Sequence, residues 1–210
     1  MGCTAQDVVA AVHAGAEIVA AHRDELVEMD RVIGDADHGE NMDRGFRAVA
    51  AKLDTSAPET PGSALKLVAS TLISTVGGAS GPLYGTAFLR AASAAGEGDE
   101  LDGPAVAAIL KAGLDGVVAR GKAEVGDKTM IDALSPAADA AKAAADDGAS
   151  AGQVLAAAAE AARNGAESTE PLVARKGRAS YLGERSAGHV DPGARSTALL
   201  LSAFAERSVR

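Results

Sequence analysis

Hydrophobic residues recur at helical spacing along most of the chain. In the first segment Val12, Ala16 and Val19 fall on one face of a helix, and the side-chain oxygen of Thr4 is suited to cap its start. No segment alternates strictly between apolar and polar residues with β-branched enrichment, so we predict no sheet. The pattern therefore predicts an all-α protein.

Breaks of glycine, proline and aspartate divide this pattern into eight helices. Pro82 suits the first position of the fourth helix, because its missing N–H would be unpaired there, and Pro136 is expected to bend the sixth. A chain of 210 residues suits a single domain, residues 1–210, with a substantial core. The helices are expected at about residues 4–29, 41–53, 63–76, 82–95, 104–120, 128–146, 150–164 and 194–207.

Aromatic residues make up only 2% of the chain, and Trp is absent. The core must therefore be built from Ala, Val, Leu and Ile. Because small side chains let backbones approach closely and Ala is the best helix former, we expect closely packed helices.

The formal net charge of −9 argues against nucleic acid or an anionic membrane surface as the main partner. It does not exclude a phosphate ligand, because a bound divalent metal inverts the local charge. The sequence has no 18-residue uncharged apolar run, and its N-terminus lacks the basic region of a signal peptide. The single cysteine, Cys3, cannot form an internal disulfide, so we expect a cytoplasmic protein.

Four connections are rich in glycine and polar residues, and loops of this kind often carry function. In an antiparallel array of helices, alternate connections lie at the same end. The four connections follow the first, third, fifth and seventh predicted helices, so we expect them to meet at one mouth. They are residues 30–41, 77–86, 121–130 and 177–193.

The first of these loops contains three aspartates, Asp30, Asp35 and Asp37. Carboxylates this close repel one another by about 4 kcal/mol per pair at 4 Å unless a cation is present. Counted from Asp35 as an EF-hand, the glycine falls one position early and Phe46 stands where glutamate is needed, so that motif fails. Oxygen ligands favour Mg²⁺ or Ca²⁺, and Mg²⁺ usually completes its shell with water and phosphate oxygens. A solvated acidic turn is the alternative.

The other three loops offer groups that bind anions. The Gly77–Thr86 loop has closely spaced glycines and a helix start, which suit a phosphate, although a plain turn fits too. In the Gly121–Met130 loop, Asp127 interrupts the spacing of a P-loop, so we reject that motif. Lys128 in the same loop is expected to meet an acidic group or a phosphate, or to lie at the surface. The last loop carries Arg178 and Arg185 as candidate phosphate partners. For His38 and His189 we favour hydrogen-bonding roles over phosphohistidine chemistry.

Together these loops resemble the nucleotide-binding L subunit of dihydroxyacetone kinases, a unit that also forms the C-terminal domain of single-chain, ATP-dependent dihydroxyacetone kinases. Four strings in the right order carry the resemblance, and they cover essentially the whole chain. They are GDADHGENM at 34–42, GGASGPLYGT at 77–86, GDKTMIDAL at 126–134, and GRASYLGER at 177–185 followed by DPG at 191–193.

The resemblance implies a barrel of eight antiparallel helices with a nucleotide site in the loops at one end. It implies that Asp30, Asp35 and Asp37 hold two Mg²⁺ ions and that Arg178 stabilises phosphate charge. Relatives often have asparagine where this chain has Glu40, whose charge would weaken anion binding if it turned inward. The implied contacts to ADP or ATP are His38, Gly39, Glu40, Asn41, Ala79, Ser80, Gly121, Met130, Arg178, Asp191, Pro192 and Gly193.

The implied activity is phosphoryl transfer to dihydroxyacetone held on a partner, subunit K. In the phosphoenolpyruvate-dependent systems, ADP stays bound and is rephosphorylated by the phosphotransferase protein M. We expect this separate-subunit form, because the sequence contains no K-like domain, and we leave a homodimer open. The alternatives are an ATP-dependent dihydroxyacetone kinase, the nucleotide domain of a fatty acid kinase, which normally carries further domains, and a non-catalytic helical interaction module.

Overall fold

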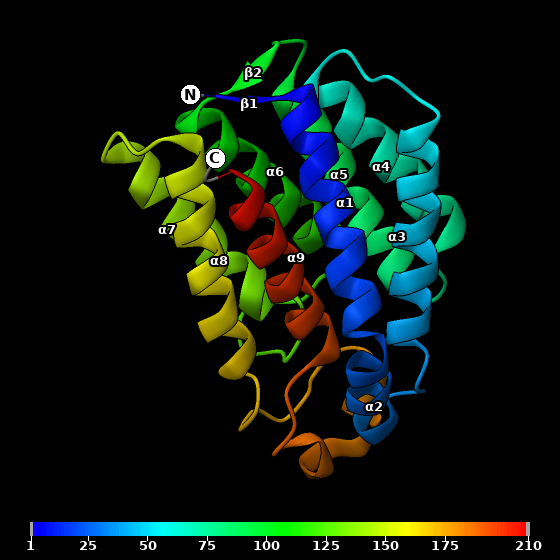
Figure 1. Cartoon of the computed structure of the whole chain (residues 1–210). Coiled ribbons are helices and arrows are strands. Elements are labelled where there is room, and N and C mark those ends of the chain that lie inside the picture. The colour runs from blue at the N-terminus through cyan, green and yellow to red at the C-terminus, as the bar shows by residue number, and fades with distance from the viewer. Residues whose placement is uncertain (1, 209–210) are drawn as a thin grey trace.

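The computed structural model describes residues 2–208, and it is almost entirely helical (Figure 1). The all-α prediction is confirmed. In the described part of the chain the α-helices are α1 (Ala5–Ala21), α2 (Arg23–Ile33), α3 (His38–Asp54), α4 (Pro61–Thr75), α5 (Ser80–Ala95), α6 (Gly103–Gly121), α7 (Ile131–Asp146), α8 (Ala151–Glu167) and α9 (Pro192–Ser208). A 3₁₀ segment, η1 (Arg178–Ser186), lies within the 177–193 connection, where no helix was predicted.

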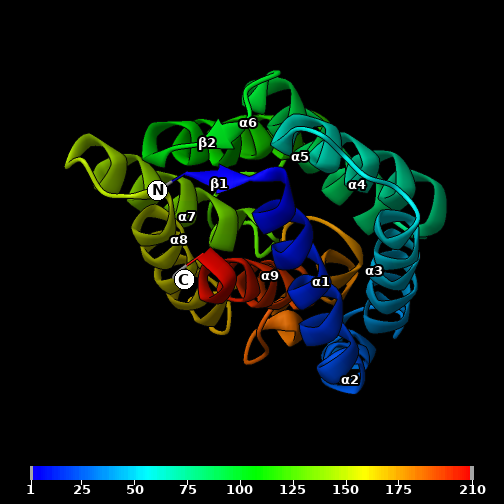
Figure 2. The ribbon, with the colours of Figure 1, turned by 45° about the horizontal axis from the view of Figure 1, so that its top comes forward.

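Eight of the helices form a closed ring (Figure 2). Each helix from α3 to α8 packs against the next one along the chain, and α1 closes the ring by packing against both α3 and α9. Helix α2 lies outside this ring and continues α1 towards the end where the long loops gather (Figure 1). The architecture is therefore an eight-helix barrel with one additional helix at its mouth.

The first predicted helix, expected to be continuous over 4–29, is interrupted at His22. The backbone of His22 leaves the helical region, with φ −103° and ψ 12°, and its Nδ1 lies 2.5 Å from Glu25 Oε2 in the first turn of α2. Val12, Val19 and Leu26 are all buried and seven residues apart, so the apolar stripe runs on through the break. The stripe is why periodicity alone predicts one helix. Helix α2 also runs on to Ile33, beyond the expected end near residue 29, so Asp30 lies in its last turn instead of in a loop.

Two other expectations need correction. A short antiparallel pair, β1 (Cys3–Thr4) with β2 (Glu100–Leu101), joins the N-terminal segment to the turn before α6, where no sheet was expected. Helix α5 begins at Ser80, two residues before the proline that was expected to start it. The predicted cap Thr4 is confirmed, because its side chain accepts the N–H of Asp7, and Ser150 caps α8 in the same way.

The α7–α8–α9 side of the barrel is packed with alanine, as the composition predicts. Ala137, Ala158 and Ala198 are completely buried there. Gly165 of α8 lies directly against α7, and a Cβ at this position would come within 2.2 Å of the Asp132 carbonyl oxygen. Small residues therefore set how closely these helices approach. None of the described helices is long and apolar enough to cross a membrane.

Gly165→Ala is expected to destabilise the protein by about 2 kcal/mol, because the added methyl group overpacks the α7–α8 contact. The matched control is Gly113→Ala in α6, where a Cβ would meet its nearest neighbour at an ordinary 3.4 Å. That change should stabilise by about 0.5 kcal/mol, because alanine has less backbone entropy to lose. Urea unfolding of both variants measures the two effects, and equal changes would contradict this packing.

Candidate functional site

The four polar loops meet at one end of the barrel, as predicted from the alternation of helices. They enclose a cavity of about 400 Å³. The predicted site residues that line it are Asp30, Asp35, Asp37, His38, Ala79, Ser80, Gly121, Met130, Arg178, Asp191, Pro192 and Gly193.

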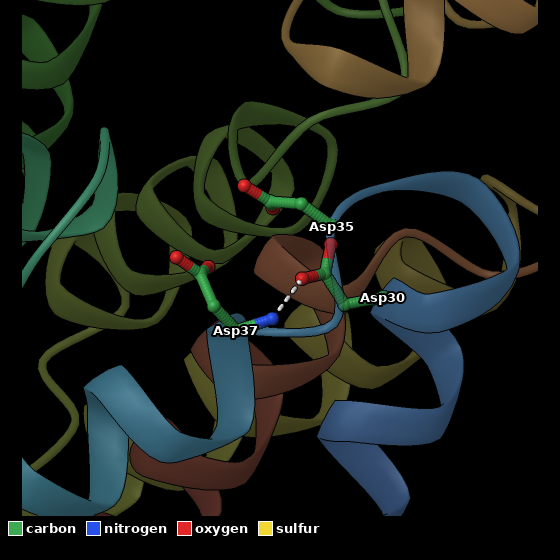
Figure 3. A group of neighbouring side chains, drawn as sticks. All are labelled: Asp30, Asp35 and Asp37. Carbon is green, nitrogen blue, oxygen red and sulfur yellow. Dashed lines mark hydrogen bonds between the residues drawn. The ribbon is translucent and has the colours of Figure 1, made fainter.

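The three aspartates lie close together at this mouth. One carboxylate oxygen from each can be chosen so that all three lie within 4.8 Å of one another (Figure 3). Asp30 is buried, whereas Asp35 and Asp37 are exposed towards the cavity. All the donors are carboxylate oxygens, the type that suits a hard cation such as Mg²⁺ or Ca²⁺. The residues present therefore fit a divalent metal.

Hydrogen bonds from the backbone fix Asp30 in this cluster. Its Oδ2 accepts the N–H of Asp37 at 2.8 Å, drawn as a dashed line in Figure 3, and the N–H of His38 at 3.1 Å. Asp37 is the residue just before α3 and His38 is its first residue, so the Asp30 carboxylate caps the start of that helix from outside it. Gly34 makes room for it, because a Cβ there would lie 2.0 Å from Asp30 Oδ1.

Arg178 contacts the exposed part of the cluster. Its Nε lies 2.6 Å from Asp35 Oδ2, and both side chains are solvent-accessible. The guanidinium group therefore lies at the rim of the cavity, beside the carboxylates and within reach of any anion that a metal would bring there. Arg185, the other arginine considered from the sequence, does not line the cavity.

His38 links three helices beneath the cavity. Its Nδ1 lies 3.1 Å from Ser80 Oγ at the start of α5, and its Nε2 lies 2.9 Å from Ser196 Oγ in α9. Burial lowers the pKa of this imidazole, which favours its neutral form. Both ring nitrogens are engaged, which is the hydrogen-bonding role expected of His38.

Several polar residues of the site were not predicted from the sequence. The hydroxyl of Tyr84 is buried and lies 2.7 Å from Ser196 Oγ and 2.9 Å from Thr197 Oγ1, so it extends the network around His38. Burial raises the pKa of Tyr84 to about 12. The carboxylate of Asp132 accepts the N–H groups of Gly126 and Thr129, at 2.5 and 2.7 Å. Asp132 lies in the GDKTMIDAL string at 126–134, so the resemblance could have indicated it. Ser196 and Thr197 of α9 lie outside all of the matching strings.

Contrary to expectation, Lys128 in the 121–130 loop neither lies at the surface nor donates a hydrogen bond to an acidic side chain. It is only 1% exposed, and its ammonium donates to backbone carbonyls instead of to an acidic group or a phosphate. His189 contributes one of these carbonyls.

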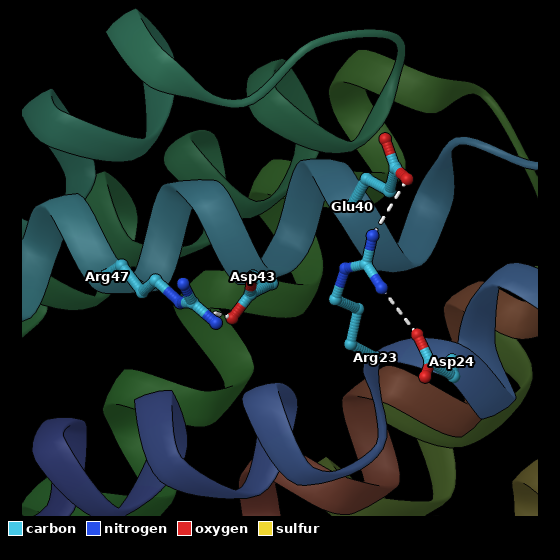
Figure 4. A network of polar contacts seen from close by, with 5 residues as sticks. All are labelled: Arg23, Asp24, Glu40, Asp43 and Arg47. Atoms are coloured by element: carbon cyan, nitrogen blue, oxygen red, sulfur yellow. Dashed lines mark hydrogen bonds and ion pairs between the residues drawn. The ribbon is translucent and has the colours of Figure 1, made fainter.

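The structure does not bring three of the predicted nucleotide contacts to the cavity lining. Gly39 packs against α2, where a Cβ would lie 2.2 Å from the Arg23 carbonyl oxygen. Glu40 pairs with Arg23 Nη2 at 2.9 Å, and Arg23 also bonds to the neighbouring aspartate of α2 (Figure 4). Asn41 Oδ1 accepts a bond from Arg44 at 2.5 Å. Glu40 therefore turns away from the cavity, and its charge is paired.

Asp191 closes the site on the α9 side. Its Oδ2 accepts the N–H of Ala194 at 2.8 Å, which caps the first turn of α9. The residue is buried, and burial raises its pKa to about 7. The capping hydrogen bond favours the ionised form of the Asp191 carboxyl group, whereas burial favours its neutral form.

An all-α barrel with a carboxylate cluster and a helix start at one mouth defines a protein with a site for a metal and an anionic ligand. The model of the DAK2 domain family matches residues 32–206, and the chain belongs to this family.

Two ADP-binding subunits of dihydroxyacetone kinases are similar to this chain over about nine tenths of its length. The chain is 46% identical over 189 residues, 90% of each chain, to the PEP-dependent dihydroxyacetone kinase, ADP-binding subunit DhaL, of Escherichia coli. It is 41% identical over 195 residues to an ADP-binding subunit DhaL of Listeria innocua, covering 92% of this chain and 91% of the other. The crystal structure of the C. freundii dihydroxyacetone kinase in complex with AMP-PNP and Mg²⁺ superimposes with a TM-score of 0.72 and 28% identity, covering 95% of this chain and 33% of that one.

The raised pKa of Asp191 predicts a pH-dependent stability in the absence of ligands. A carboxyl group whose pKa rises from 3.8 to about 7 on folding contributes stability that is fully present below pH 3.8 and is lost as the pH rises through about 7. Asp191→Asn retains a capping side chain but cannot ionise. Its free energy of unfolding relative to wild type should therefore increase between pH 4.5 and pH 7.5.

Asp191→Ala provides the comparison for this titration. It removes the cap and should cost about 1 kcal/mol relative to Asp191→Asn at both pH values. Urea unfolding at the two pH values measures all three proteins. A difference between wild type and Asp191→Asn that does not change with pH would contradict the assignment.

Proposed function

We propose that this chain is the nucleotide-binding subunit of a phosphoenolpyruvate-dependent dihydroxyacetone kinase. In this proposal it holds Mg²⁺ with ADP or ATP and delivers the phosphoryl group to dihydroxyacetone on subunit K. Protein M then rephosphorylates the ADP in place. One observation carries the proposal: the aspartate cluster, the start of α5 and Arg178 all face the same cavity. The names of the similar ADP-binding subunits support it.

The proposed ligand arrangement follows from the chemistry of each wall. Asp30, Asp35 and Asp37 would hold two Mg²⁺ ions, and the N–H groups at Ala79 and Ser80, where α5 begins, suit an anionic phosphate. The remaining lining residues, Gly121, Met130 and Asp191 to Gly193, would surround the rest of the nucleotide. Gly39, Glu40 and Asn41, which do not line the cavity, would hold the first turn of α3 in place through their contacts with Arg23 and Arg44.

Bound Mg²⁺ supplies neutralisation of the phosphate oxygens during phosphoryl transfer. The chain's own residues hold this site in place before any ligand arrives. Asp30 is fixed by two backbone N–H groups, so one carboxylate needs little reorganisation. Arg178 lies beside Asp35 and would exchange part of that contact for phosphate oxygens, placing positive charge where the transferred group is most negative.

The partners in the proposal are the K and M proteins, in a cytoplasmic setting, with residues 1–210 acting as one domain. Asp35 and Asp37 of the aspartate cluster and Arg178 are accessible at the rim of the cavity. A phosphoryl group held there would therefore be open to an acceptor presented by another protein. The formal net charge of −9 argues against nucleic acid as a partner, and a homodimer is left open.

Asp35→Asn is expected to weaken the binding of Mg-ADP by at least about tenfold, because it removes one anionic ligand from the cluster. The control is Asp24→Asn, an aspartate of α2 that pairs with Arg23 outside the cavity and should leave the affinity unchanged. Calorimetric titration measures both variants, with circular dichroism to check that helicity is retained. Wild-type affinity in Asp35→Asn would refute the ligand assignment.

The phosphoryl donor is tested by reconstitution. With K, M and the phosphoenolpyruvate-dependent phosphotransferase components, the protein should form dihydroxyacetone phosphate from dihydroxyacetone using substoichiometric ADP. Omitting M should abolish the reaction. Sustained turnover with ATP and K alone would instead identify an ATP-dependent kinase.

A further inference from the structure

Lys128 is one of the most deeply buried side chains of the described structure, and its charge is unexplained by the site as proposed. Only 1% of the residue is exposed. Its Nζ donates to the carbonyl oxygens of Thr169 at 2.8 Å, Leu172 at 3.0 Å and Glu170 at 3.3 Å, and to that of His189. An ammonium group has three N–H donors. Four carbonyls therefore occupy all of them, and none is left for a phosphate.

These carbonyls belong to the two ends of a single loop. Residues 170–189, which we call the Arg178 loop, run from the end of α8 to the start of α9. Three of the carbonyls lie at the start of this loop or next to it, and the fourth lies at its end. The backbone bond from Gly188 N–H to the Glu170 carbonyl, 2.8 Å long, joins the same two ends. The Lys128 ammonium therefore lies at the neck of the loop.

A positive charge is what this neck requires. Four carbonyl dipoles directed at one point repel one another unless a cation lies between them. Burial lowers the pKa of Lys128, while the carboxylates of Asp191, Glu170 and Asp132 act in the opposite direction. The backbone of Lys128 is left-handed, with φ 62°, an uncommon conformation for a residue other than glycine. The 126–129 turn is held in this form by Asp132, so it aims the ammonium into the neck.

The loop that Lys128 closes carries the arginine of the site. Gly177, Arg178 and Ala179 line the cavity, and Arg178 reaches Asp35. A second bond joins the loop to the 126–129 turn, from Arg175 N–H to the Asp127 carbonyl oxygen at 3.1 Å. The Lys128 ammonium and the Arg175 bond therefore tie the loop that carries Arg178 to the 126–129 turn at two places.

We propose that Lys128 is a positioning residue, which clamps the neck of the Arg178 loop and thereby holds Arg178 beside the aspartate cluster. The inference deepens the proposed function and rests on it where nucleotide affinity is concerned. It differs from a role in general stability, because it predicts that the effect of Lys128 on ligand binding passes through Arg178.

Lys128→Met tests the clamp, because it keeps most of the length of the side chain and removes its charge and donors. Two measurements are made: amide hydrogen exchange over residues 170–189, and the Kd for Mg-ADP. Lys142→Met is the matched control, since Lys142 is an exposed lysine of α7 that pairs with Asp146 and does not line the cavity. The same Lys128 change is also made in an Arg178→Ala background, which completes a double-mutant cycle.

In Lys128→Met, exchange over residues 170–189 should quicken at least tenfold while that of α3 to α5 stays unchanged, and the Kd for Mg-ADP should rise roughly 10- to 100-fold. In the Arg178→Ala background the same change should alter Kd by less than about twofold. Lys142→Met should match wild type in both measurements. Should Lys128→Met not fold, Lys128→Gln, which retains an N–H donor group on a shorter neutral side chain, enters the same comparisons with smaller expected changes.

Wild-type exchange in a folded Lys128 variant would overturn the clamp. An equal loss of affinity with and without Arg178 would overturn the positioning role, leaving general stability as the explanation. A wild-type protein that binds no Mg-ADP would defeat the proposed function, and the exchange comparison alone would then decide the clamp.

Discussion

The carboxylate of Asp30 is the contact on which the mouth of the barrel depends. Asp30 lies in the last turn of α2, its carboxylate accepts the N–H groups of Asp37 and His38 at the start of α3, and it is the buried member of the aspartate cluster. Hydrogen bonds to a charged group contribute about 1.5–3 kcal/mol each, so the bonds that form the 34–37 turn also orient the metal-binding oxygens. The glycine at position 34 is required by the same contact. Local folding and metal chemistry are therefore coupled in one side chain.

Buried polar contacts give the other walls of the cavity the same rigidity. His38 joins α3 to α5 and α9, and Tyr84 extends this network, with burial raising its pKa and lowering that of His38. In the described structure, no buried side-chain nitrogen or oxygen lacks a hydrogen-bond partner. Satisfied networks of this kind specify one arrangement of helices, which an alanine-rich core with few large side chains does not do by itself. The mouth is thus fixed by polar contacts and the body of the barrel by close packing.

The fold class could be predicted because helical periodicity is visible in short stretches of sequence. The meeting of the four loops could be predicted because alternate connections in an antiparallel array lie at the same end. The break at His22 could not be predicted, since the apolar stripe continues from Val19 to Leu26 across it. The resemblance named residues but not directions, so Glu40 was expected near the nucleotide, whereas Arg23 holds it on the outside. Lys128 escaped prediction because its partners are backbone carbonyls 41 to 61 residues away, which leave no trace in residue type.

In the proposed function, the aspartate cluster is an incomplete metal site, which the phosphates of a nucleotide complete. Metal and nucleotide must then favour each other's binding by the same factor, because coupling between two ligands is reciprocal. Calorimetric titration of ADP with Mg²⁺ and with a chelator in its place measures this factor directly. We expect ADP to bind at least about 100-fold more tightly when Mg²⁺ is present, a coupling of about 3 kcal/mol. An ADP affinity that is unchanged by removal of the metal would contradict it.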